Sequence, residues 1–193
     1  MRIIGGQFRG LHLAAVGTGD AAAHLRPTSD RVREAIFNLL LNGGYGDPVV
    51  GARVLDLFAG TGALGLEALS RGAAHATLID NGPVARSLLR RNIALTRTEG
   101  RCEIITRNAT TLGANRGAPF TLIFLDPPYG MGIGERALAS ARTGGWLAPG
   151  ALVIWEENAA PLPPDGLQQL DQRRYGDTLV TILAHQAGAD GPD

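Results

Sequence analysis

One stretch, residues 54–69, constrains the fold of this chain more than any other, because it changes from strand to turn to helix within a few residues. It starts as an apolar run that contains one acid, Asp56, and then passes through closely spaced glycines at Gly60, Gly62 and Gly65. Apolar residues at helical spacing follow. A strand, a glycine turn and a helix in immediate succession open a βαβ unit, whose ligand lies beyond the carboxyl end of the strand. We therefore expect the functional site at that end of a sheet.

The glycine turn suits two kinds of ligand. Gly60 to Gly65 fits G-x-G-x-x-G, and Asp80 follows at the interval of an acid that holds a ribose hydroxyl, which favours a dinucleotide such as NAD. Asp56 favours another ligand, because a carboxylate near the strand end would repel a pyrophosphate. S-adenosylmethionine has an ammonium, a sulfonium and a ribose but no phosphate. The turn by itself leaves both ligands open.

Length and composition indicate one α/β domain. The chain has 193 residues, 45% of them hydrophobic and 19% charged. We expect the domain over residues 1–186, with 1–25 as an N-terminal hairpin or extension and 187–193 as a disordered tail. There is no apolar run of membrane-spanning length, no signal-peptide pattern and only one cysteine, so we expect a cytoplasmic monomer without a membrane segment. The four histidines have no metal-ligand spacing, so no metal is expected.

Hydrophobic patterning predicts that strands and helices alternate along the chain. Residues 1–16 are expected to form a short extended segment or hairpin, and a helix is expected to begin after Pro27, with Thr28, Ser29 or Asp30 as its N-cap, and to reach Leu40. Further strands are predicted at 76–80, 102–106, 120–126 and 151–155, further helices at 63–69, 83–96 and 134–143, and a terminal hairpin at 167–175 and 178–185. The expected fold is an α/β, Rossmann-like, mainly parallel sheet with a C-terminal antiparallel hairpin.

A second motif, Asp126-Pro127-Pro128-Tyr129, follows the strand predicted at 120–126 and would lie at the same edge as the glycine turn. The two prolines remove two backbone donors, which leaves carbonyl oxygens and the Asp126 carboxylate as acceptors. Acceptors placed on an exocyclic amino group stabilise the positive charge that forms when its nitrogen takes a methyl group. Tyr129 could stack on a flat base. The motif therefore indicates methyl transfer to an amino nitrogen.

Together these motifs resemble a known family. Asp56-x-Phe58-Ala59-Gly60-Thr61-Gly62 with Asp126-Pro-Pro-Tyr129 is similar to class I S-adenosylmethionine-dependent methyltransferases that act on amino nitrogens. Three further segments narrow the resemblance: Arg-Ile-Ile-Gly-Gly from Arg2, Arg-Pro-Thr-Ser-Asp-Arg-Val-Arg-Glu-Ala-Ile-Phe-Asn from Arg26, and Tyr-Gly-Asp-Thr from Tyr175. They resemble bacterial enzymes that methylate guanine N2 in small-subunit (16S) ribosomal RNA. The resemblance extends to about residue 185, and the Arg-Pro-Thr segment is its most particular part.

This resemblance implies a seven-stranded class I methyltransferase fold with S-adenosylmethionine across the carboxyl edge of the sheet. It assigns the methionine part to Asp56, Phe58, Ala59, Gly60, Thr61 and Gly62, the ribose to Asp80, and the adenine to Asn108 and Ala109. It implies that Thr28 closes over the cofactor and that Asp126, Pro127, Pro128 and Tyr129 carry catalysis. RNA contacts are expected from Arg2, Arg9, Arg26, Arg31 and Arg33. The implied partner is 16S ribosomal RNA, alone or in a small ribosomal subunit.

Other interpretations stay open at this stage. The arginines at the start of the first long helix are explained equally by a solvated helix start. Because the net charge is zero, no overall electrostatic field points to a polyanionic partner. The same pocket could methylate an amino group in DNA or a glutamine amide in a protein. In other functional classes, the chain could be an NAD-dependent oxidoreductase or a catalytically silent RNA-binding module.

Overall fold

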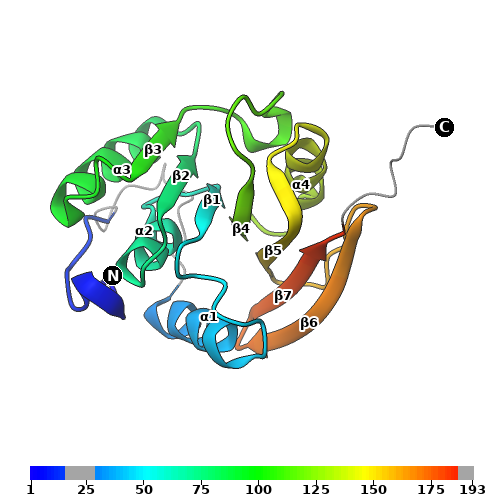
Figure 1. Ribbon diagram of the computed structural model, residues 1–193, viewed down its shortest axis with the longest axis horizontal. Coiled ribbons are helices and arrows are strands. Elements are labelled where there is room, and N and C mark those ends of the chain that lie inside the picture. The colour runs from blue at the N-terminus through cyan, green and yellow to red at the C-terminus, as the bar shows by residue number, and fades with distance from the viewer. Residues whose placement is uncertain (16–28, 187–193) are drawn as a thin grey trace.

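The computed structural model describes residues 1–15 and 29–186, which include a seven-stranded sheet (Figure 1). The strand order is β3-β2-β1-β4-β5-β7-β6. The strands are β1 (Arg53–Leu57), β2 (His75–Ile79), β3 (Cys102–Ile105), β4 (Phe120–Leu125), β5 (Leu147–Glu157), β6 (Leu167–Tyr175) and β7 (Thr178–His185). β3, β2, β1, β4 and β5 pair in parallel, whereas β7 is antiparallel to both of its neighbours. This confirms the predicted Rossmann-like sheet with a terminal antiparallel hairpin.

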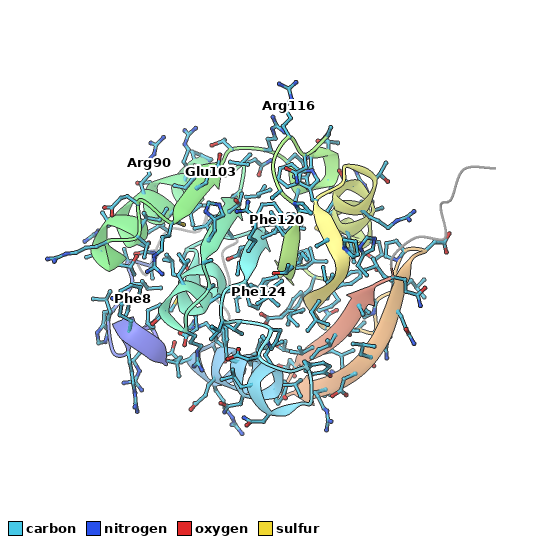
Figure 2. The ribbon with its side chains drawn as sticks, in the orientation of Figure 1. Phe8, Arg90, Glu103, Arg116, Phe120 and Phe124 are labelled. Carbon is cyan, nitrogen blue, oxygen red and sulfur yellow. The ribbon has the colours of Figure 1, made fainter. Side chains whose placement is uncertain are left out.

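Helices cover both faces of the sheet. α1 (Asp30–Asn42), α2 (Ala63–Ser70) and α3 (Pro83–Thr96) pack on one face, and α4 (Ile133–Thr143) with the short 3-10 helix η2 (Ala109–Thr111) packs on the other. The strands supply both faces in alternation: Val54 of β1 packs with the first group, and Leu55 with the second. Phe124 of the central strand β4 packs with the first group, and Phe120 of the same strand with the second; both are labelled in Figure 2. A parallel sheet covered on both faces explains the near-continuous apolar strands of the sequence.

The N-terminal segment is folded onto α2. A bridge between Arg2 and His12 closes a loop that contains the 3-10 turn η1 (Gly6–Phe8). The buried carboxylate of Glu67 accepts the backbone N–H groups of Ile4 at 2.7 Å and Gly5 at 2.8 Å. The segment therefore has a defined position beside α2, as the expected hairpin requires.

One boundary differs clearly from the sequence-based expectation. β5 begins at Leu147 and ends at Glu157, so it is longer than the predicted strand at 151–155 and has two acids at its end. The start of α1 is as expected: the helix begins at Asp30, and its N-cap is Ser29, one of the three candidates, whose hydroxyl accepts the Val32 N–H at 3.2 Å. The expected tail at 187–193 lies outside the described residues. No helix in the described part of the chain is both long and apolar enough to cross a membrane.

Candidate active site

The glycine turn joins the end of β1 to α2 through backbone angles that favour glycine. Phe58, Gly60 and Gly62 all have positive φ, at 62°, 56° and 77°. Phe58 adopts this conformation without being glycine, and such strained residues cluster at ligand sites. A Cβ on Gly62 would lie 2.9 Å from a methyl group of Leu89, so this glycine is needed for core packing as well as for its backbone angle. These backbone angles and this packing fix the conformation of the turn at the carboxyl end of β1.

Asp56 of β1 is buried against this turn and is hydrogen-bonded to the start of α2. Its side chain is only 1% exposed, and it accepts the backbone N–H of Gly65 at 2.9 Å, one of the unpaired donors in the first turn of α2. The pKa of Asp56 is raised to about 7, chiefly because burial disfavours the charged form. The Gly65 hydrogen bond opposes that shift, and the negative charges of Asp126 and Asp80 add to it. We therefore correct the expectation that this carboxylate faces the methionine part: it is buried beneath the turn and fixes the turn's shape.

Asp80 follows β2 and is partly exposed beside the turn. One of its oxygens, Oδ2, accepts the Gly60 N–H at 2.9 Å, and Oδ1 accepts the Gly82 N–H at 2.8 Å. Each carboxylate oxygen has a second acceptor site. Asp80 can thus hold the glycine turn and still accept hydroxyl groups from a ligand.

The residues expected at the adenine lie farther along the same edge. Asn108 is exposed and caps η2, with its Oδ1 accepting the Thr110 N–H at 2.9 Å. Ala109 is buried, with 4% of its surface exposed. Ala109 therefore packs against the protein core and can offer a ligand only a small apolar surface, whereas Asn108 fixes the conformation of the loop that precedes η2. Thr28 falls outside the described residues.

The Asp126-Pro-Pro-Tyr129 loop leaves the end of β4, next to β1 in the sheet. Asp126 is partly exposed, Pro127 is buried and Pro128 is exposed. The Tyr129 hydroxyl lies 3.5 Å from the Thr178 hydroxyl of β7. This contact gives a physical role to the Tyr-Gly-Asp-Thr segment of the sequence, because its threonine supports the aromatic ring of the second motif.

Two carboxylates that sequence reasoning missed lie beside this loop. Glu156 and Glu157 end β5 and are 2% and 8% exposed. Glu157 accepts the N–H of Gly130, the residue after Tyr129, at 3.2 Å. The pKa of Tyr129 is raised to about 12, mainly by burial, and the bond with Thr178 opposes this shift. The negative charges of Asp126, Glu156 and Glu157 add to it. Two acids directly after the apolar run at 151–155 were the available signal.

The charges at this edge discriminate between the two ligands that the glycine turn left open. Asp80 and Asp126 follow β2 and β4, the two neighbours of β1, and both are partly exposed at this edge. A pyrophosphate would meet these two carboxylates at short range, which is unfavourable. An ammonium and a sulfonium would be attracted by them. The residues present therefore fit S-adenosylmethionine and disfavour NAD.

The arginines expected to contact RNA divide into two groups. Arg2, Arg9 and Arg31 are exposed. Arg33 is fully buried: its guanidinium pairs with Asp30 at 2.8 Å and with Glu67 at 3.7 Å, and it donates to the Arg2 carbonyl. Its assignment to RNA was wrong, because a buried guanidinium with protein acceptors cannot contact a phosphate. Arg26 lies outside the described residues.

Comparisons with known proteins agree with this geometry. A family model described as "Conserved hypothetical protein 95" matches residues 1–184. Ribosomal RNA small subunit methyltransferase D of Escherichia coli strain K12 is 42% identical over 190 residues, which cover 97% of this chain and 91% of that protein. The Haemophilus influenzae protein of the same name is 34% identical over 192 residues, with 96% and 93% covered. The solved structure of putative methyltransferase yhhF from Escherichia coli has a TM-score of 0.81 at 38% identity, covering 97% of this chain and 99% of that one.

Proposed function

The chain belongs to the family of ribosomal RNA small subunit methyltransferase D, and from this premise we propose that it methylates the exocyclic N2 of a guanine in 16S ribosomal RNA. The methyl donor in this proposal is S-adenosylmethionine. The observation that carries the proposal is the position of Asp126. It stands at the end of β4 beside the glycine turn of β1, where a methyl donor on the turn and an amino group at Asp126 would be neighbours.

The residues of the chain have separate tasks in this reaction. When bound, S-adenosylmethionine would supply the methyl group of its sulfonium; the sulfur would keep the electron pair of the broken C–S bond and leave as a neutral thioether. Asp126 accepts a hydrogen bond from an N2–H group of the guanine. It thereby stabilises the positive charge that grows on this nitrogen as the new C–N bond forms. The nitrogen then loses one proton, which Asp126 can take and pass to water. Tyr129 offers a ring on which the flipped base stacks.

The acidic surroundings of Tyr129 favour guanine over adenine. Guanine presents two neighbouring donor groups, N1–H and N2–H₂, on its Watson–Crick edge, whereas adenine presents an acceptor at N1. Of the carboxylates near Tyr129, Asp126 is partly exposed, and it attracts the first pattern and repels the acceptor of the second. This supports the guanine assignment independently of the family.

For the cofactor we propose that the turn residues Phe58 to Gly62 face its methionine part, that Asp80 binds the ribose, and that Asn108 and Ala109 bound the adenine. Thr28 is proposed to close over the cofactor. We propose further that the exposed Arg2, Arg9 and Arg31 contact RNA phosphates, because they stand on the N-terminal segment and on the first turn of α1.

The proposal is tested by incubating the purified protein with methyl-labelled S-adenosylmethionine and ribosomal RNA from cells that lack the gene. The 16S and 23S RNAs are then separated and digested, and labelled nucleosides are identified by mass spectrometry. We expect N2-methylguanosine in 16S RNA only, and none with Asp126→Ala. Label in N6-methyladenosine, in 23S RNA alone or in protein would overturn the assignment of the substrate.

A further inference from the structure

The formal net charge of zero conceals an uneven distribution of charge along the sheet. Residues 81–119, which form α3, β3 and the connection to β4, have seven arginines and only two acids. Residues 120–186, which form β4, α4 and the three last strands, have four arginines and seven acids. β3 and β6 are at opposite ends of the sheet (Figure 1), so the excess of arginines lies toward the β3 end and the excess of acids toward the β6 end.

Most of the seven arginines of the positive end are available to a partner, and Arg107 also donates to the Leu112 carbonyl at 2.8 Å. The seven are Arg86, Arg90, Arg91, Arg97, Arg101, Arg107 and Arg116. None of them forms an ion pair with another described residue. All but Arg86 and Arg101 are exposed. In Figure 2 the side chains of Arg90 and Arg116 point outward, away from the sheet. Cations that have no acidic partner within residues 1–15 and 29–186 repel one another, and an anionic partner would relieve this repulsion.

The helix α3 places part of this row beside the catalytic edge. It begins at Pro83, three residues after Asp80, so its first turn lies at the end of the sheet where the cofactor is proposed to bind. Arg86 and Arg90 are four residues apart and therefore lie on the same side of the helix. Arg97 caps its far end, about 16 Å from Arg86 at the helical rise of 1.5 Å per residue. The arginines thus form a track that leads away from the catalytic edge.

We infer that α3 and the adjacent loops, from Arg86 to Arg116, bind the phosphate backbone of the RNA substrate; this inference rests on the proposed function. The catalytic edge is itself acidic, with Asp80, Asp126 and the glutamates of β5, and so it repels phosphates. A target base can enter that edge only if its backbone is held elsewhere. The track on α3 provides the opposite charge beside the site, and the negative β5–β7–β6 end disfavours docking from the other side.

Amino-acid usage alone does not produce this pattern. The chain has no lysine, so arginine is its only strong cation, and this explains why its basic residues are arginines. It does not explain why the arginines collect at one end of the sheet and the acids at the other. Their segregation is a property of position in the fold, as electrostatic docking of a polyanion requires.

The test compares two triple variants that remove the same charge. Arg86→Gln/Arg90→Gln/Arg91→Gln alters the track, and Arg136→Gln/Arg142→Gln/Arg174→Gln alters exposed arginines at the opposite end. Binding of unmodified 16S RNA is measured over a range of salt concentrations, with S-adenosylhomocysteine present so that no methyl transfer occurs. For the track variant we expect the Kd to rise at least about tenfold and the slope of log K against log salt to become shallower by about 2. The control should bind within about twofold of the parent.

Equal losses of RNA affinity in both variants would overturn the inference, because total charge would then determine binding. Unchanged RNA affinity in both variants would also overturn it, because another surface would then bind the RNA. An unchanged circular dichroism spectrum and an unchanged affinity for S-adenosylhomocysteine establish that the track variant is folded. The proposed function is judged separately, by methylation with the parent. If the parent methylates and the track variant binds RNA normally, the function stands and the docking surface fails. If the parent does not methylate and the track variant loses RNA binding, the surface stands and the function fails.

Discussion

The carboxylate of Glu157, at the end of β5, accepts the backbone N–H of Gly130 at 3.2 Å and so ties the last residue of one strand to the loop that follows its neighbour. Gly130 comes directly after Tyr129, so this bond and the Thr178 hydroxyl hold the Asp126-Pro-Pro-Tyr129 loop from two sides. Both supports come from the C-terminal part of the chain, far in sequence from the glycine turn.

Loss of the Glu157 support should reduce catalysis more than cofactor binding. A hydrogen bond to a charged acceptor contributes about 1.5–3 kcal/mol, so Glu157→Ala should lower kcat roughly ten- to a hundredfold. Glu157→Gln keeps an acceptor oxygen and should recover most of that loss. Single-turnover rates of both variants, with the Kd for S-adenosylhomocysteine as a control, measure this. Equal rates for the alanine and glutamine variants would mean that the tether does not position the loop.

Asp126 should be the most sensitive residue of the site. In the proposed mechanism its carboxylate acts on charge that develops only in the transition state, and removal of one such group costs on the order of a hundred- to a thousandfold in rate. We expect Asp126→Ala to lose at least that much turnover while it binds S-adenosylmethionine nearly normally. Asp126→Asn should be intermediate, because it keeps an oxygen acceptor but not the charge. Methylation by the alanine variant within about threefold of the parent would refute the role.

Asp80 should determine cofactor affinity. Its replacement by alanine removes an acceptor for the ribose and also releases the Gly60 N–H that now bonds to Oδ2. A loss of about 1.5–3 kcal/mol corresponds to a roughly ten- to a hundredfold higher Kd for S-adenosylmethionine. Isothermal titration calorimetry measures this Kd directly. An unchanged value would exclude Asp80 from the ribose contact.

The buried Asp56 should make stability depend on pH. The pKa of its carboxyl group is about 7 in the folded protein and near its ordinary 3.8 in the unfolded chain, so the folded state binds more protons between these values. The free energy of unfolding should therefore fall as pH rises from about 4 to about 7, by up to about 1.4 kcal/mol per pH unit from this group. Asp56→Asn should lack this component. Urea unfolding of both proteins at pH 5, 6, 7 and 8 tests it, and parallel pH profiles would contradict it.

Arg33 and Arg31 provide a matched pair for separating stability from RNA contact. Glu67 keeps its ion pair with Arg71 at 2.8 Å when Arg33 is removed, but Arg33→Ala takes away the buried guanidinium that pairs with Asp30 and donates to the Arg2 carbonyl, and it should lower the free energy of unfolding by about 1–3 kcal/mol. Arg31 is exposed, so Arg31→Ala should change stability by less than about 0.5 kcal/mol. Urea unfolding at neutral pH compares them. Similar stabilities for the two variants would show that the buried ion pair is not structurally important.

Local patterns in the sequence were sufficient for the elements, their order and the two motifs. The glycines at the end of an apolar strand, and the prolines after Asp126, restrict the backbone through their own covalent structure, so neighbouring residues were enough to predict a turn and a loop. Hydrophobic periodicity likewise reports which face of an element is buried, and this was enough to predict a parallel sheet that brings the loops after its strands to one edge.

Only the tertiary structure decided which side chains meet at that edge and which are withdrawn from it. Asp56 is directed under the turn because Gly65 offers an unpaired N–H, and Arg33 is buried because the strand and helix packing brings Glu67 opposite it. Glu157 reaches Gly130, and the arginines of α3 are separated from the acids of β5, because the strand order places these segments in space. Such contacts join residues far apart in the chain. Their strength depends on distance and on burial, which no local pattern records.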